Sequence, residues 1–236
     1  MAKDNPQTAT ALIVAAGRGV RMGSETPKVL LKVGNRPLLA HTLRAFEQAR
    51  AVDQIILVVA EDLLAWVARE AIDAHGIRKV RQIVPGGERR QDSVRLGLQA
   101  IQPECRLVAI HDGARPLITP ELIDHVVAQG ARHGAAALAV RPGDTVRRGE
   151  GETFQVTLDR NKLWLMQTPQ VFSCDLILSA HRQAIERELE GTDDVALVEA
   201  MGHPVRVVEG HRDNIKVTTP EDLLFVEAVL SGRAKR

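Results

Sequence analysis

Aromatic side chains are scarce in this sequence, and an excess of charge of either sign is absent. Tyr does not occur, and aromatic residues make up 3% of the chain. The protein therefore has few platforms on which unpaired nucleic-acid bases could stack. Lys and Arg number 31 and Asp and Glu number 30, which leaves a formal net charge of +1. This balance gives no electrostatic reason to expect nucleic acid or an anionic membrane as a partner.

Cysteine and long apolar runs are also rare. The two cysteines, Cys105 and Cys174, lie far apart in the sequence and form no C-x-x-C pair. This spacing provides neither a thiolate zinc motif nor a disulfide framework, and it suits a reducing cytoplasm. The first ten residues lack the apolar stretch of a signal peptide, and no apolar run approaches the roughly 18 residues of a membrane helix. We therefore expect a soluble, cytoplasmic protein with no membrane partner.

Short apolar runs alternate with helical patterns, which is typical of an α/β fold with a mainly parallel sheet. The 236 residues allow one large domain with a sizeable core, and we expect residues 1–236 to form a single domain. Continuous rather than alternating apolar runs predict that helices cover both faces of the sheet. The predicted strands are Ala11–Ala15, Gln54–Val59, Arg81–Val84, Leu107–Ile110 and Ala135–Val140. The predicted helices are Leu38–Ala49, Leu63–His75, Gln91–Ile101, Pro120–His133 and Pro220–Leu230.

One segment interrupts this alternation. Asp144–Asp159 contains two β-like stretches around the turn-rich sequence Gly149-Glu150-Gly151, which favours a hairpin over another helix. Polar residues occupy much of both faces, so the hairpin is not a core strand pair of the main sheet. The sequence leaves open whether it is a surface loop or an arm that reaches another subunit.

The strongest motif is Leu12–Lys28, LIVAAGRGVRMGSETPK. Gly17 and Gly19 follow the first strand, where backbone N–H groups can approach phosphate oxygens closely. Arg21 and Lys28 add positive charge beside that backbone. The glycine spacing is one residue too long for the dinucleotide-binding motif, and no Walker G-K-[ST] sequence occurs. A lone G-x-G would indicate an ordinary turn, so the prediction of a phosphate site depends on the combination of glycines and cations.

Two further motifs follow predicted strands. Asp112 and Arg115, in HDGARP, come at the carboxyl end of a strand, where open α/β sheets bind ligands. A carboxylate there could hold Mg²⁺ or a sugar hydroxyl, and the arginine could clamp a phosphate; the alternative is a surface Asp–Arg pair. In GGERRQDSV, Gly87 and Ser93 could contact a ligand, or they could belong to a plain capped loop.

Several residues nearer the C-terminus gain significance only from the other motifs. Arg160 follows the hairpin, Thr168 lies in QTPQ, and Thr192 begins TDD. A threonine before a helix is usually a cap, and a loop lysine such as Lys216 in DNIKVTTPED is usually solvated.

Together these motifs resemble the 2-C-methyl-D-erythritol 4-phosphate cytidylyltransferase family of the non-mevalonate isoprenoid pathway. The resemblance rests on AAGRGVRMGSETPK, HDGARP, TLDRNKLW, QTPQ, TDD and DNIKVTTPEDL, in the family's order, and it runs from about Ala11 to the final helix. It implies a Rossmann-like nucleotidyltransferase fold with a β-arm at about residues 141–162, through which two copies would form a homodimer. It also implies CTP and a polyol phosphate as substrates, and Mg²⁺ or another divalent cation as cofactor.

The resemblance also implies roles for individual residues. The catalytic cations would be Arg21, Lys28 and Lys216. The residues that contact CTP would be Ala15, Ala16, Gly17, Gly19, Gly87 and Ser93. The residues around the methylerythritol phosphate would be Asp112, Arg115, Thr145, Arg160, Thr168 and Thr192, with Thr145 and Arg160 serving the neighbouring subunit's site. No protein ligand of the metal follows from the motifs.

Two positions depart from the family pattern, and two alternative functions remain. Val29 replaces a common Gln, and Gly113 replaces the Ala of HDAARP. A cytidylyltransferase for another polyol phosphate, such as ribitol 5-phosphate, would share the first loop. A protein that senses CTP without turnover would bind the nucleotide but release no pyrophosphate. We expect no fused cyclodiphosphate synthase module after Arg236.

Overall fold

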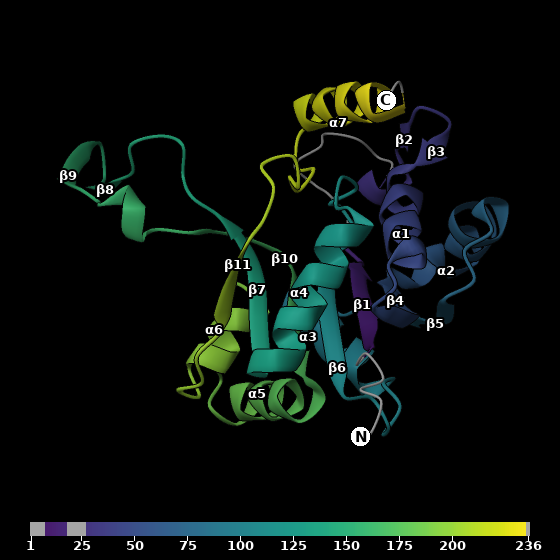
Figure 1. The fold of residues 1–236 in the computed structure, drawn as a ribbon, viewed down its shortest axis with the longest axis horizontal. Helices are drawn as coiled ribbons and strands as arrows, with labels where there is room; N and C mark the ends of the chain where they lie inside the picture. The colour runs from purple at the N-terminus through teal and green to yellow at the C-terminus, as the bar shows by residue number, and fades with distance from the viewer. Residues whose placement is uncertain (1–7, 18–26, 235–236) are drawn as a thin grey trace, which may run out of the picture.

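The computed structural model describes residues 8–17 and 27–234, and a seven-stranded sheet forms its centre (Figure 1). The strand order is β11-β7-β10-β6-β1-β4-β5. The strands of this sheet are β1 (Ala9–Ala15), β4 (Val52–Val59), β5 (Val80–Pro85), β6 (Leu107–Asp112), β7 (Ala135–Val140), β10 (Leu165–Ser173) and β11 (Arg206–Glu209). All neighbouring pairs are parallel except those of β10, which runs antiparallel to β6 and β7. The predicted mainly parallel α/β fold is confirmed.

Helices pack on both faces of the sheet because the strands are apolar on both faces. Ile13 and neighbouring alternate residues of β1 face one core, with side chains of α1 (Leu38–Gln48), α4 (Pro120–His133) and the π-helical turn η4 (Val67–Ile72). Leu12 faces the second core, with α3 (Arg90–Gln99), α5 (Cys174–Glu186) and α6 (Asp194–Glu199). The prediction of a sheet covered on both faces is therefore correct.

The remaining elements are short or lie at the end of the chain. The C-terminal helix α7 (Pro220–Ala234) packs through Val226 against Val217 and Leu117 in a third, small core. Two small strands, β2 (Lys32–Val33) and β3 (Arg36–Pro37), form an antiparallel pair. The other short helices are η2 (Lys28–Leu30), η3 (Glu61–Leu63), α2 (Leu64–Trp66), η5 (Asp73–His75) and η6 (Arg160–Lys162). Within the described ranges, no helix combines the length and the apolarity that crossing a membrane requires.

The predicted elements all occur, with boundaries that differ by a few residues. The segment predicted as one helix over Leu63–His75 is helical, but it consists of η3, α2, η4 and η5 in succession rather than of one regular α-helix. The sequence pattern alone predicted no element for β10, α5, α6 or β11. β10 contains Pro169 and a register irregularity between Met166 and Gln170, and a proline within an apolar run argues against a central strand.

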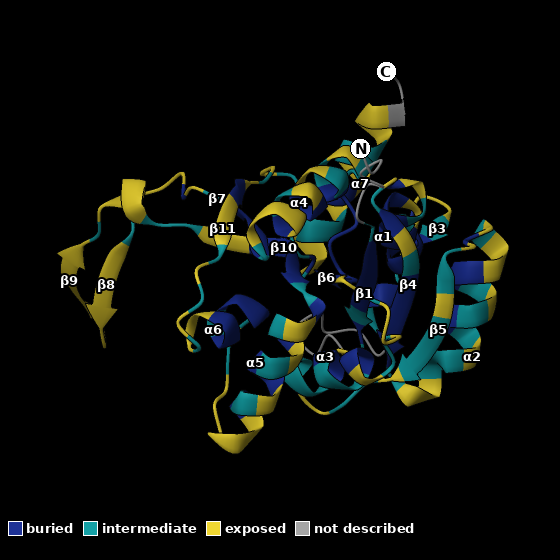
Figure 2. Ribbon diagram, turned by 60° about the horizontal axis from the view of Figure 1, so that its bottom comes forward, coloured by how far each residue is buried: buried dark blue, intermediate teal, exposed yellow. Residues whose placement is uncertain are grey.

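The hairpin predicted within Asp144–Asp159 is present and projects away from the body of the molecule (Figure 1). Its strands β8 (Arg147–Glu150) and β9 (Thr153–Thr157) pair antiparallel with each other only. All nine residues of the two strands are exposed (Figure 2). The segment is thus an arm that stands away from the sheet rather than a loop folded onto it.

Candidate active site

Two adjoining pockets lie at the carboxyl edge of the parallel strands. The first pocket is lined by the end of β1 and the residues after it (Ala15, Ala16 and Gly17), by Lys28, by residues 87–90 and by Ser93. The second pocket is lined by Arg115, Met166, Gln167, Thr168, Gln170, Thr192 and Asp193. Arg90, Asp112 and Lys216 line both pockets. Open α/β sheets bind their ligands at this edge.

Close backbone packing shapes the first pocket. A Cβ atom on Gly86 would lie 2.3 Å from the Ala16 Cβ and 2.9 Å from the Ser93 Oγ, and one on Gly87 would lie 2.6 Å from the Asp92 Cβ. These glycines let the loop after β5 approach the loop after β1 closely. The buried Ser93 hydroxyl accepts a hydrogen bond from the Gly87 N–H at 3.0 Å. Ser93 therefore fixes the Gly87 loop from the first turns of α3 and is not the N-cap of that helix.

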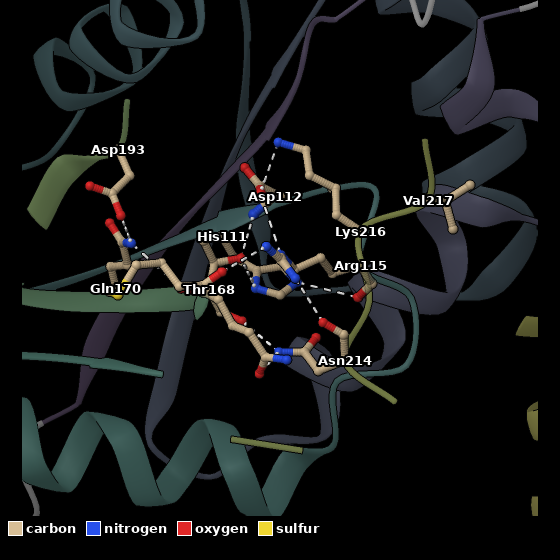
Figure 3. Close-up of polar contacts among 12 residues, drawn as sticks. His111, Asp112, Arg115, Thr168, Gln170, Asp193, Asn214, Lys216 and Val217 are labelled. Atoms are coloured by element: carbon tan, nitrogen blue, oxygen red, sulfur yellow. Dashed lines mark hydrogen bonds and ion pairs between the residues drawn. The ribbon is translucent and has the colours of Figure 1, made fainter. Parts of the chain in front are cut away.

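The buried carboxylate of Asp112 is the electrostatic centre of the site. Its Oδ1 lies 3.1 Å from the Arg90 Nε. Its Oδ2 lies 3.1 Å from the Lys216 Nζ and 3.4 Å from the Arg115 Nε (Figure 3). Burial alone would raise the pKa of Asp112, but the three cations outweigh that effect and hold its pKa well below the usual range. Asp112 is a buried anion shared by three cations, not half of a surface Asp–Arg pair.

Arg115 and Thr168, two predicted site residues beside Asp112, make most of their hydrogen bonds within the protein. Three of the five N–H donors of Arg115 point to acceptors of the chain, which are Asp112, the Asn214 carbonyl at 2.7 Å and the Met166 carbonyl. The Thr168 hydroxyl accepts from the Asp112 N–H at 3.0 Å. Both side chains therefore hold Asp112 in place, and both line the second pocket.

His111 is buried behind Asp112 in a defined tautomer. Since the Thr168 hydroxyl accepts from the Asp112 backbone, its proton is free to be donated to the His111 Nδ1, 3.0 Å away. The Nε2 then carries the ring proton and donates to the Arg115 carbonyl at 3.3 Å. Desolvation by burial is the main cause that lowers the pKa of His111, to about 3. A neutral imidazole thus joins β6 to the Arg115 turn and to β10.

 Lys28 and Lys216 lie far apart in the sequence, but both line the first pocket. The Lys28 Nζ donates to the Val217 carbonyl at 3.0 Å, next to Lys216 in the chain. The short helix η2 begins at Lys28, directly after Pro27. Val29 is 1% exposed and packs in the core, which explains why an apolar residue is accommodated beside Lys28.

Gly113, the second departure from the family pattern, also has a packing reason. A Cβ atom at this position would lie 2.9 Å from the Ala15 Cβ and 3.2 Å from the Leu39 Cδ1. The Gly113 N–H donates to the Val14 carbonyl at 2.8 Å, which joins the loop after β6 to the end of β1. The absence of a side chain therefore allows the two loops of the site to lie close together.

The structure does not place every expected site residue. Arg21 and Gly19 lie outside the described residues. Thr145 and Arg160 lie on the arm, are exposed, and line neither pocket of their own chain. Thr192 lines the second pocket, but it is not a cap, because Asp193 is the N-cap of α6 and its side chain accepts from the Ala196 N–H.

Among the charged residues that sequence reasoning missed, Arg90 and Asp194 form a connected pair at the site. Arg90 is the first residue of α3 and contacts Asp112, and its Nη1 donates to the Asp194 Oδ2 at 2.8 Å. The available signal was the pair of arginines at the start of a helix, in GGERRQDSV, where the helix dipole disfavours positive charge. Such a placement indicates a compensating buried anion.

The described residues can accommodate a divalent cation only with help from a ligand. Among residues 8–17 and 27–234, no group of three or more His, Cys, Asp or Glu side chains could hold a metal ion. Both oxygens of Asp112 already contact cations. The donor set therefore fits a cation that is bound mainly by phosphate oxygens and water, as Mg²⁺ commonly is in phosphoryl-transfer sites.

The open α/β sheet and the cationic pockets at its carboxyl edge define an enzyme of the nucleotide-binding α/β class that acts on phosphate groups. Comparison with known proteins gives the family. The model of the family "IspD: 2-C-methyl-D-erythritol 4-phosphate cytidylyltransferase" matches residues 9–232, and the chain belongs to this family.

Individual relatives agree with this assignment. The chain is 48% identical over 227 residues to the 2-C-methyl-D-erythritol 4-phosphate cytidylyltransferase of Pelotomaculum thermopropionicum, covering 96% of this chain and 95% of the relative. It is 49% identical to part of a bifunctional enzyme IspD/IspF of Desulforudis audaxviator, covering 94% of this chain and 56% of that protein. Among solved structures, the 4-diphosphocytidyl-2C-methyl-D-erythritol synthase of Anaerococcus prevotii matches with a TM-score of 0.84 and 31% identity, over 96% of this chain and 97% of that one.

Proposed function

We propose that this chain transfers CMP from CTP to 2-C-methyl-D-erythritol 4-phosphate, a step of the non-mevalonate isoprenoid pathway. The products are 4-diphosphocytidyl-2-C-methyl-D-erythritol and pyrophosphate. Membership of the family supports the activity. The structural observation that supports it best is the pair of adjoining pockets that share Arg90, Asp112 and Lys216. Two anionic substrates could meet at that boundary.

In the proposed reaction, a phosphate oxygen of the polyol phosphate attacks the α-phosphorus of CTP. The new O–P bond forms while the bond from the α-phosphorus to the bridging oxygen breaks, and the electron pair leaves with pyrophosphate. The attacking phosphate is already ionised near neutral pH, so the reaction needs no side-chain nucleophile or strong general base. Catalysis then consists mainly of positioning and of electrostatic stabilisation of the pentacoordinate transition state.

We propose that the first pocket binds CTP. Ala15, Ala16 and Gly17 would present the backbone beside the phosphates, and Gly87 and Ser93 would form the opposite wall. Lys28 and Lys216 would offset the repulsion between the two anions and stabilise charge that develops on the phosphate oxygens. By the family resemblance, Arg21 would share this task and Gly19 would contact CTP; both lie outside the described residues. When bound, Mg²⁺ would add positive charge at the triphosphate.

We propose that the second pocket binds the polyol phosphate. The buried Asp112 would accept a hydrogen bond from a substrate hydroxyl while it positions Lys216, 3.1 Å away. Arg115 would hold that carboxylate and still have two N–H donors for the substrate. Thr168 and Thr192 line the same pocket and would contribute to its shape and polarity.

We further propose that the arm belongs to the site of a second copy of the chain. Phe154 on β9 is 80% exposed, and a lone two-stranded hairpin is only marginally stable in water. The Arg160 Nη1 donates to the Gly143 carbonyl at 2.9 Å, which holds Arg160 at the base of the arm. A homodimer would cover the arm and would bring Thr145 and Arg160 to the partner's polyol-phosphate pocket. In this proposal residues 1–236 form one domain, with the arm at about 141–162 as its extension.

A steady-state assay of pyrophosphate release tests the proposed function. CTP would be supplied with methylerythritol phosphate or with ribitol 5-phosphate, each with and without Mg²⁺. We expect magnesium-dependent release with methylerythritol phosphate and much slower release with ribitol 5-phosphate. Faster turnover of ribitol 5-phosphate would assign a different polyol substrate, and CTP binding without any release would indicate a sensor.

A further inference from the structure

A chain of buried ion pairs leads from Asp112 away from the two pockets. Arg90 bridges two carboxylates, because its Nε donates to the Asp112 Oδ1 at 3.1 Å and its Nη1 donates to the Asp194 Oδ2 at 2.8 Å. On the far side, the His181 Nε2 lies 3.0 Å from the Asp194 Oδ1. The side chains of Asp194 and His181 are 1% and 4% exposed, so solvent barely screens these contacts.

Arg90, Asp112 and Asp194 stabilise one another in their ionised forms. Burial would raise the pKa of Asp194, but Arg90 and His181 outweigh that effect and lower it. Burial would likewise lower the pKa of Arg90, and the carboxylates of Asp194 and Asp112 together raise it above its usual value. Removing one member would leave an uncompensated buried charge, which is strongly unfavourable. The geometry of the Arg90 bridge is therefore tightly held.

Asp194 belongs to the same loop as two residues of the second pocket. Thr192 and Asp193 line that pocket, and Asp194 is the first residue of α6. Gln170 on β10 fixes the loop from the other side, since its Oε1 accepts from the Asp194 N–H at 3.1 Å and its Nε2 donates to the Asp193 Oδ2 at 2.7 Å. Figure 3 shows the contact between Gln170 and Asp193 beside Thr168. The Thr192 loop is thus held to β10 through Gln170 and to α3 through Arg90.

We infer that Asp194 is a positioning residue for the transfer reaction: through Arg90 it fixes the Asp112 carboxylate relative to the Thr192 wall of the second pocket. Asp194 itself lines neither pocket. Arginine suits this role because its planar guanidinium can donate to two carboxylates at once, whereas a lysine ammonium is a compact point charge. The inference rests on the proposed function, and it adds a residue that determines the geometry of the polyol-phosphate subsite.

Asp194→Asn tests the inference with a nearly isosteric change that removes the charge. We expect KM for the polyol phosphate to rise about tenfold, because a displaced Asp112 would accept the substrate hydroxyl less well, while KM for CTP should change less than about twofold. Arg90→Lys, which keeps the positive charge but loses the planar fork, should produce a shift of the same kind. In the double variant the two effects should not add, because both changes remove the same link.

Arg95→Gln is the matched control, because Arg95 lies on the same helix and lines neither of the two pockets. It should leave both KM values unchanged. A folded Asp194→Asn protein with unchanged KM values, or with equal rises for both substrates, would overturn the inference. If Asp194→Asn does not fold, Arg90→Lys decides by the same two KM values. Absence of pyrophosphate release by the wild-type chain would instead refute the proposed function, which keeps the two failures distinct.

Discussion

The floor of the site, which consists of Asp112 and the cations Lys28, Arg90, Arg115 and Lys216, and the projecting arm place charged side chains in opposite ways. At the floor, Asp112 is 6% exposed and contacts Arg90, Arg115 and Lys216 of its own chain. On the arm, every residue of β8 and β9 is exposed (Figure 2). The floor is therefore organised before any ligand binds, whereas the arm gains a defined environment only if something else packs against it.

This difference separates the two tasks of the proposed reaction. Stabilising a transition state requires charges whose positions are fixed in advance, and buried ion pairs provide that. Binding of the second substrate, in contrast, can use a side chain that a second copy of the chain supplies. The predictions below address first the floor, then the arm, and then the packing that keeps the floor rigid.

The largest effect is expected for Lys28→Ala. Removing one preorganised cation should lower kcat about 10²–10³-fold, which corresponds to about 3–4 kcal/mol of transition-state stabilisation. Pyrophosphate release measures the rate, and thermal unfolding shows whether the protein stays folded. Lys32→Ala is the control, since Lys32 is exposed on β2 and lines neither pocket. Near-normal turnover by Lys28→Ala would contradict the claim that the cations of the floor stabilise the transition state.

Arg160→Ala should affect one substrate rather than the rate of chemistry. Loss of a hydrogen bond to a charged group, about 1.5–3 kcal/mol, should raise KM for the polyol phosphate about 10–100-fold and leave KM for CTP nearly unchanged. Lys162→Ala, in the same short helix η6, should change neither value. Equal weakening of both substrates would contradict the assignment of the arm to the polyol-phosphate pocket.

Gly86→Ala tests whether the nucleotide side of the floor depends on close backbone packing. The added methyl group would lie 2.3 Å from the Ala16 Cβ, so one of the two loops must move. Overpacking of this kind costs about 1–3 kcal/mol, and we expect KM for CTP to rise roughly fivefold or more. Gly232→Ala is the control, because a Cβ there has no atom within 4 Å. An unchanged KM for CTP would contradict the claim, because it would show that the loops after β1 and β5 can move apart without any effect on nucleotide binding.

The last prediction concerns stability rather than catalysis and the neutral His111 beneath Asp112. Its folded pKa of about 3 lies below the unfolded value of about 6.5, so the unfolded chain binds the extra proton between these pH values. Stability should therefore fall as the pH decreases from about 6.5, by at most about 1.4 kcal/mol per pH unit from this group. His111→Gln should flatten the pH dependence of the free energy of unfolding between pH 6 and pH 4, measured in urea, by about that slope. Parallel curves for the two proteins would contradict the burial of a neutral imidazole.

Much of the floor could be predicted from the sequence because its motifs follow strands. Asp112 and the Gly86-Gly87 pair each come directly after an apolar run, and parallel strands bring their carboxyl ends to one edge of a sheet. Lys216 belongs to no such pattern. Its position became clear only from the structure, in which it contacts Asp112.

Long-range pairing explains what could not be predicted. Arg90 and Asp194 are 104 positions apart, and no local periodicity connects a helix start on α3 with the start of α6. β10 contains Pro169 and runs antiparallel to its neighbours, so its pattern differs from that of the other central strands. The hairpin itself was predicted from its turn residues, but residue spacing alone does not say whether a second copy covers it.

Mixing two impaired variants tests the central claim, a floor from one chain and an arm from another, most directly. Lys28→Ala and Arg160→Ala proteins would be unfolded together, refolded as a mixture and assayed for pyrophosphate release at a polyol-phosphate concentration below the wild-type KM, where both variants alone are slow. A two-fold dimer in which each arm completes the partner's site should recover about a quarter of the wild-type activity, because about half the dimers are mixed and each mixed dimer has one intact site. Activity no higher than that of the separate variants would contradict the claim.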